Sequence, residues 1–142
     1  MIEARATFDG DRMLADLKAA HVRAVARVTV TLWTEIQQVL NVPNTGVRVK
    51  RAHGKGSYTV YPNPSKPGEP PRKRTGWLQR NVVYEFYDGG LRSRVGLTAN
   101  AEYGIPLDQG SRTMAARPWL FVTAERMAPQ LAAIAQREVA RG

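Results

Sequence analysis

An apolar stripe along residues 11–40 constrains this chain more than any other feature of its sequence. Its members recur at three- and four-residue steps, which places them on one face of an α-helix. They are Leu14, Leu17, His21, Val25, Val28, Leu32, Ile36 and Val39. Asp9 or Asp11 can cap the start of this helix, and Asn41 followed by Pro43 ends it. The sequence therefore predicts one long amphipathic helix.

Beyond this helix the apolar period changes to two, which is typical of β-strands. Residues 47–51 and 58–60 alternate on either side of a glycine-containing turn and predict a first hairpin. Residues 82–87 and 91–97 flank the turn Asp88-Gly89-Gly90 and predict a second hairpin with a clearer pattern.

A proline-rich segment, residues 62–74, separates the two hairpins. It contains five prolines and four basic residues. Because proline has no backbone N–H, the segment cannot pair as an interior strand, and we expect an extended, exposed loop. A linker between two domains would leave two very small halves. We therefore predict one domain over residues 1–142, with a long functional loop that becomes ordered only when it docks.

Three further signals complete the order of elements. Trp77 and Leu78 start a helical turn, residues 101–110 form a short helix or turn, and Pro118 can open a last helix. The apolar face of that last helix consists of Trp119, Leu120, Thr123, Met127, Leu131, Ile134 and Ala135. The order helix, hairpin, proline loop, hairpin, helix predicts an α+β fold. We expect an antiparallel β-sheet of two hairpins, packed by a long N-terminal helix and a C-terminal helix.

Composition and charge limit the classes of function. The absence of cysteine excludes disulfides and cysteine-ligated metal sites. The first five residues lack the apolar region of a signal peptide, and no apolar run approaches the roughly 18 residues that span a bilayer. We therefore expect a soluble product, made in the cytoplasm, with no membrane partner. The formal charge is +9, and residues 48–94 carry +8 of it through eleven bases and three acids. This basic middle can face nucleic acid or an acidic protein.

No set of catalytic groups converges in the sequence. The twelve acids are scattered without paired carboxylates, and the serines lack the context of a nucleophile elbow. Two histidines, His21 and His53, are too few for a histidine-rich metal site. We therefore predict no enzyme activity, no catalytic residue, no metal and no cofactor.

Basic and aromatic side chains are interleaved after the proline-rich segment. The run Arg72-Lys73-Arg74 precedes Trp77 and resembles a phosphate-binding surface. A solvated loop, or a loop that docks on an acidic protein, fits better because no helix-turn-helix or RNA-binding signature accompanies the run. Tyr103 and Trp119 are further large anchors, for the core or for a subunit interface, and core packing is the favoured role of Trp119. The candidate interface residues are Arg72, Lys73, Arg74, Trp77, Tyr103 and Trp119.

Three groups of residues, within a region spanning roughly residues 10 to 140, resemble the neck, or tail-completion, family of long-tailed bacteriophages. These groups are Pro67-Gly68-Glu69-Pro70-Pro71 with Arg74-Thr75-Gly76-Trp77-Leu78, then Ala101-Glu102-Tyr103-Gly104 with Leu107-Asp108-Gln109-Gly110-Ser111, then Ala116-Arg117-Pro118-Trp119-Leu120. The family typically reads PGxPP, TGxL, a tyrosine-containing segment ending in acid-x-Gly-Thr, and a small residue before Pro-Phe-Leu. Ser111 and Trp119 replace the usual threonine and phenylalanine with similar chemistry.

The resemblance implies a structural virion protein of the head–tail neck, made in the cytoplasm of the host bacterium. Its copies would form a ring, expected to be hexameric, that joins the tail to the connector as a tail-completion or tail-terminator protein. Its partners would be head connector or head-closure proteins on one side and tail tube or tail terminator proteins on the other, with transient contact to DNA in the channel. The alternative from the residues themselves is a basic nucleic-acid-binding accessory protein.

Overall fold

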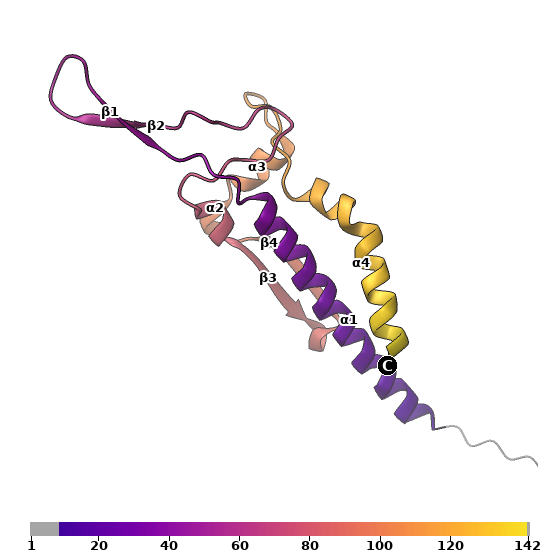
Figure 1. The fold of residues 1–142 in the computed structure, drawn as a ribbon. Helices are drawn as coiled ribbons and strands as arrows, with labels where there is room; N and C mark the ends of the chain where they lie inside the picture. The colour runs from indigo at the N-terminus through magenta and orange to yellow at the C-terminus, as the bar shows by residue number, and fades with distance from the viewer. Residues whose placement is uncertain (1–8, 142) are drawn as a thin grey trace, which may run out of the picture.

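The computed structural model describes residues 9–141 and has the predicted α+β class. The prediction that no signal peptide begins the chain falls on residues outside this range. The molecule is elongated, with the long first helix as its spine and a two-stranded ribbon projecting from one end (Figure 1). The elements are α1 (Gly10–Val39), β1 (Val47–Lys50), β2 (Ser57–Val60), α2 (Trp77–Arg80), β3 (Val82–Tyr87), β4 (Arg92–Leu97), α3 (Gly104–Gln109) and α4 (Phe121–Arg141).

The long helix α1 confirms the prediction from the apolar stripe. Of the two candidate caps, Asp9 acts: its Oδ1 accepts a hydrogen bond from the backbone N of Arg12 at 3.0 Å. The stripe is not buried over its whole length, because Leu14 and Leu17 are 65% and 51% exposed. Ile36 is the member of the stripe that is fully buried, and the other buried residues of α1 are Ala20, Ala24 and Thr29, which lie outside the predicted stripe.

The core lies at the C-terminal end of α1. Its buried members are Ile36, Leu40, Val82, Trp119 and Leu120. Trp119 is 0% exposed, and its Nε1 donates to the carbonyl of Gly104 at 2.9 Å. The inclusion of Trp119 among the candidate interface residues is therefore corrected: its ring is a core anchor, held by packing and by a satisfied N–H.

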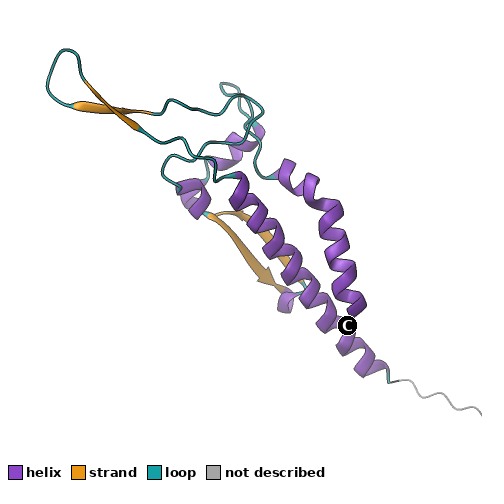
Figure 2. Cartoon of the chain, viewed as in Figure 1, coloured by secondary structure: helices purple, strands orange, loops and turns teal. Residues whose placement is uncertain are grey.

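The two predicted hairpins form, but as two separate antiparallel sheets instead of one (Figure 2). β3 pairs with β4 from Val82↔Leu97 to Tyr87↔Arg92, and this sheet packs on α1. There Trp33 of α1 meets the Tyr84 ring edge to face at 5.6 Å. β1 and β2 pair only with each other over four residues. The β3–β4 hairpin packs on α1, whereas the β1–β2 hairpin projects from the end of the body, so the two hairpins share no edge (Figure 1).

The last helix, α4, packs against α1 (Figure 1). We had expected it to pack on the β-sheet. The buried side chains of α4, among them Met127, face α1, and Arg126 of α4 pairs with Glu35 of α1 at 2.6 Å. The helix begins at Phe121, three residues after the predicted start at Pro118. Among the described residues, no helix combines the length and the apolar character that crossing a membrane requires.

Candidate functional site

A groove of about 630 Å³ lies where the β1–β2 ribbon joins the body of the molecule. Segments that are far apart in the sequence line it: the end of α1, the proline-rich segment, α2, α3 and the loop before α4. Five of the six predicted interface residues meet here, namely Arg72, Lys73, Arg74, Trp77 and Tyr103. These five residues, which the sequence marks for separate reasons, thus line one groove.

The proline-rich segment forms one wall of the groove and is held to the body by backbone hydrogen bonds. Lys73 forms an isolated parallel β-bridge with Pro43, which follows α1. Its backbone N–H donates to Val42 O at 2.7 Å, and its carbonyl accepts from Asn44 N at 2.8 Å. Gly68 N donates to Ala116 O at 2.9 Å. The expectation that this loop is ordered only on docking is therefore corrected. The N–H donors that the segment contributes to these bonds belong to Lys73 and Gly68. The prolines of the segment occupy positions that donate no backbone hydrogen bond to the body.

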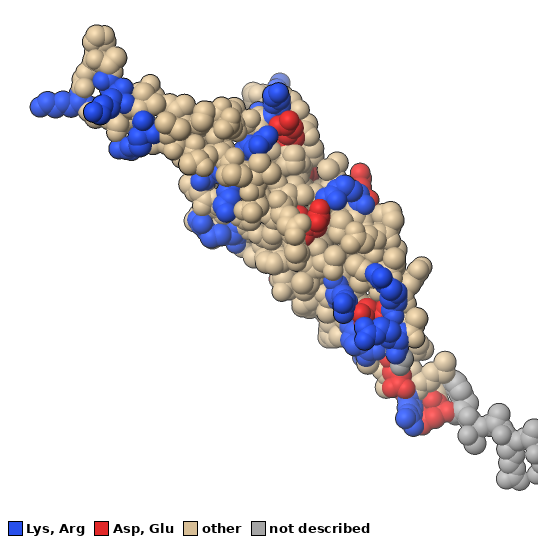
Figure 3. All heavy atoms as spheres, viewed as in Figure 1, with Lys and Arg blue, Asp and Glu red and all other residues tan. Residues whose placement is uncertain are grey.

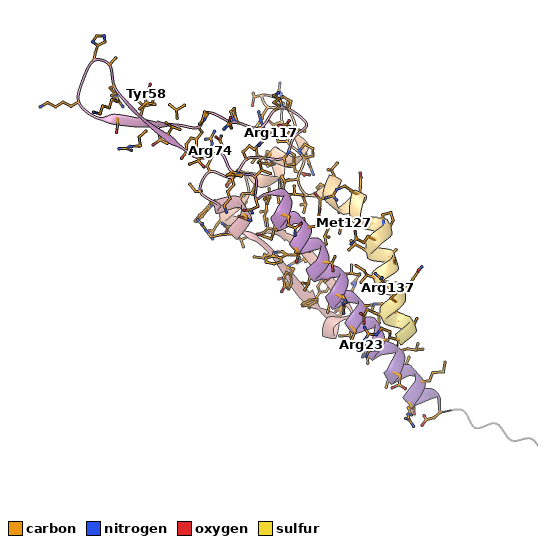
Figure 4. All side chains as sticks on the ribbon, viewed as in Figure 1. Arg23, Tyr58, Arg74, Arg117, Met127 and Arg137 are labelled. Carbon is orange, nitrogen blue, oxygen red and sulfur yellow. The ribbon has the colours of Figure 1, made fainter. Side chains whose placement is uncertain are left out.

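Four cationic side chains line the groove, and no Asp or Glu does. The guanidinium of Arg74 lies over the ring of Tyr61 at 4.5 Å, and Lys73 Nζ donates to Asn41 Oδ1 at 3.1 Å. Arg117 Nη1 reaches the hydroxyl of Ser65 at 3.5 Å. Arg74 and Arg117 both lie near the junction between ribbon and body in Figure 4, and in Figure 3 several blue groups stand out from the tan surface there. The groove therefore has a positive potential.

Glu69 is the acid nearest to this cluster in the sequence, and it is paired outside the groove lining. The Lys66 backbone N–H donates to its carboxylate at 3.2 Å, and Arg72 Nη2 lies 3.5 Å away. The Lys66 hydrogen bond, helped by the Arg72 charge and opposed by partial burial, lowers the pKa of Glu69. Glu69 therefore stays ionised at neutral pH. Of the four cationic side chains that line the groove, it partly offsets the charge of Arg72.

Two aromatic side chains stand at the rim. Trp77 and Tyr103 are 46% and 47% exposed, and burial of the remainder raises the pKa of the Tyr103 hydroxyl. Trp77 follows Gly76, whose φ of +77° starts α2 from the left-handed region that glycine favours. Its Nε1 donates to Asn100 O at 3.2 Å, and Arg80 lies 5.9 Å from its ring centre. The indole is thus fixed in place while much of it remains accessible.

Among the lining residues that were not candidates are three polar or aromatic ones: Asn44, Tyr61 and Arg117. Arg117 lies inside a motif of the family resemblance and so carried a signal, and Tyr61 directly follows the second alternating run of the first hairpin. Asn44 carried none. It is 1% exposed, its Oδ1 accepts from Asn63 N at 3.0 Å, and its Nδ2 has no partner among the described residues. A buried donor without a partner is costly, which makes Asn44 a notable member of the site.

The described residues contain no group of three or more His, Cys, Asp and Glu side chains placed to hold a metal ion. What the groove does offer is cationic donors beside aromatic and apolar walls, a set suited to binding an anionic group. Comparison of the chain with protein-family models, with curated proteins and with solved structures gives no match.

Proposed function

We propose that this chain is a structural subunit of the head–tail neck of a long-tailed bacteriophage. Its copies assemble into a ring, expected to be hexameric, that joins the tail to the connector as a tail-completion or tail-terminator protein. The motif resemblance supplies this class of function. The observation that carries the proposal is that one small chain exposes two different apolar surfaces on separate flanks.

The first apolar surface lies along β3. This strand pairs only with β4, so its other edge is open among the described strands. Tyr84 and Phe86 project from the same side of this strand with their ring centres 5.7 Å apart, and Phe86 is 43% exposed. Open apolar edges pair readily with other chains unless something covers them. This surface is therefore well suited to contact with a neighbouring subunit.

The second apolar surface lies on α4, and α1 separates it from β3 (Figure 1). Phe121 and Val122 open this helix, and both are about half exposed. Two unlike surfaces on separate flanks fit a head-to-tail contact between identical subunits, and such a contact closes into a ring when the rotation between subunits permits. Apolar surface of this kind is uncommon on a chain that acts alone.

The test combines imaging with one substitution. Electron cryomicroscopy of virions that contain this chain is expected to show a ring of copies at the neck, and loss of the chain is expected to leave full heads and free tails unjoined. Phe86→Asp places a charge on the β3 surface and is expected to block ring assembly. Thr113→Asp adds the same charge to an exposed loop and serves as the control. One asymmetric copy per virion, or normal joining without the chain, would contradict the proposal.

A specific observation also favours the alternative of a nucleic-acid-binding accessory protein. The ribbon formed by residues 47–60, here called the arm, carries Arg48, Lys50, Arg51 and Lys55 and no acid. In Figure 3 its visible charged atoms are blue. If this function holds, duplex DNA binds the purified protein with an affinity that falls steeply with salt, and removing the arm charges reduces that slope. Neck function predicts no such dependence for ring assembly.

A further inference from the structure

We propose that the groove between the arm and the body binds an extended acidic peptide segment of a partner protein. The inference rests on the proposed function, in which an adjoining protein of the head–tail junction supplies that segment. In this contact, carboxylate side chains of the partner bind the arginine and lysine side chains of the groove. Apolar side chains of the partner, placed between its carboxylates, pack on the apolar floor of the groove.

Charge is the first argument. Arg72, Lys73, Arg74 and Arg117 line the groove without a carboxylate among the lining residues. Within the described part of the chain, Arg72 is the one of these four with an acid within salt-bridge distance, namely Glu69 at 3.5 Å on the same loop. The other three bases contact neutral groups of the chain. Such an arrangement leaves guanidinium donors available for the paired hydrogen bonds that carboxylates accept.

The floor of the groove favours a peptide over a free ion. Leu40, Leu78, Leu107 and Met114 contribute apolar surface between the bases. A segment that alternates acidic and apolar residues satisfies both kinds of wall, because successive side chains of an extended chain point in opposite directions.

The aromatic residues favour a peptide over a single nucleic-acid strand. Base stacking needs open ring faces. The guanidinium of Arg74 covers one face of Tyr61 at 4.5 Å, and Arg80 lies over Trp77 at 5.9 Å. Two of the three rings that line the groove are therefore already engaged by cations of the same chain. The volume of about 630 Å³ holds a few side chains and lies within the usual range of ligand pockets.

Binding of labelled peptides to the purified protein tests this inference. The probe is a fluorescein-labelled peptide of alternating aspartate and leucine, compared with a lysine–leucine peptide and with oligothymidylate of equal length. We expect the acidic peptide to bind and the other two probes to bind at least about tenfold more weakly. Arg74→Gln combined with Arg117→Gln is expected to weaken the acidic peptide by about tenfold or more, as loss of charge-assisted hydrogen bonds does.

The matched control is Arg48→Gln combined with Lys50→Gln, which removes the same charge from the arm and is expected to change peptide affinity less than about threefold. Circular dichroism establishes that both variants fold. Three results overturn the inference: no peptide binding, equal loss in the two double variants, or tighter binding of oligothymidylate. A fourth result also overturns it: if the protein self-associates and the self-association displaces the peptide, the groove binds a second copy of this chain and not an acidic peptide. Since no virion is involved, peptide binding can fail while ring assembly at the neck stands, and the converse holds too.

Discussion

The buried carboxylate of Asp108 joins two segments that the sequence keeps apart. Its Oδ1 accepts hydrogen bonds from the backbone N–H groups of Trp119 at 2.8 Å and Leu120 at 2.7 Å, and the residue is 5% exposed. Asp108→Ala leaves both N–H groups buried without a partner. Each unsatisfied donor costs about 1–3 kcal/mol, so we expect the loss of two partners to lower the free energy of unfolding by about 2–6 kcal/mol. Asp108→Asn keeps one acceptor oxygen and is expected to lose about half as much.

Urea unfolding followed by circular dichroism measures this loss, and thermal unfolding is expected to show a fall in Tm of about 3 °C for each kcal/mol. Glu102→Ala is the control, because it removes an exposed carboxylate six residues before Asp108 and should change stability by less than about 0.5 kcal/mol. If Asp108→Ala loses no more than Glu102→Ala, the carboxylate does not hold the start of α4, and the argument from the two hydrogen bonds is wrong.

Two further predictions concern close packing and pH. At Gly104 a Cβ would lie 2.7 Å from Leu78 Cδ1, so we expect Gly104→Ala to destabilise the protein by about 1–3 kcal/mol in urea unfolding, whereas Gly96→Ala, which meets open space, should not show a comparable packing loss. Glu69 has a lowered folded pKa, so its contribution is present above the unfolded value near 4.5 and is lost as pH falls through the folded value. We therefore expect the stability difference between the wild type and Glu69→Gln to be larger at neutral pH than in acid; equal differences at both would contradict the assigned pairing.

Local periodicity was sufficient to predict the helices and both hairpins, because the repeat of apolar residues depends only on the element that contains them. The start of α4 was not predictable in this way. It depends on Asp108, which lies in α3 and binds N–H groups eleven and twelve residues later. The separation of the hairpins into two sheets likewise depends on packing against α1, which no local pattern encodes.

The candidate site was predictable where composition was unusual. Arg72, Lys73 and Arg74 form a run, and Trp77 follows it closely, so their proximity was visible in the sequence. Asn44 enters the groove because its backbone pairs with Lys73, a contact between segments separated by a whole hairpin. No residue type or spacing announces such a pairing, and only the folded chain brings its members together.

The arm has a consequence for how the molecule unfolds. Its ladder joins four pairs of residues from Val47↔Val60 to Lys50↔Ser57, and no other described helix or strand makes extensive contact with it. A two-stranded ribbon alone is marginally stable in water. The arm therefore opens in local fluctuations that leave the core around Ile36 intact, and its amide hydrogens exchange with solvent long before those of α1. A partner that binds the arm in its paired form must offset the conformational entropy lost when these fluctuations stop, which lowers its affinity and hastens its release.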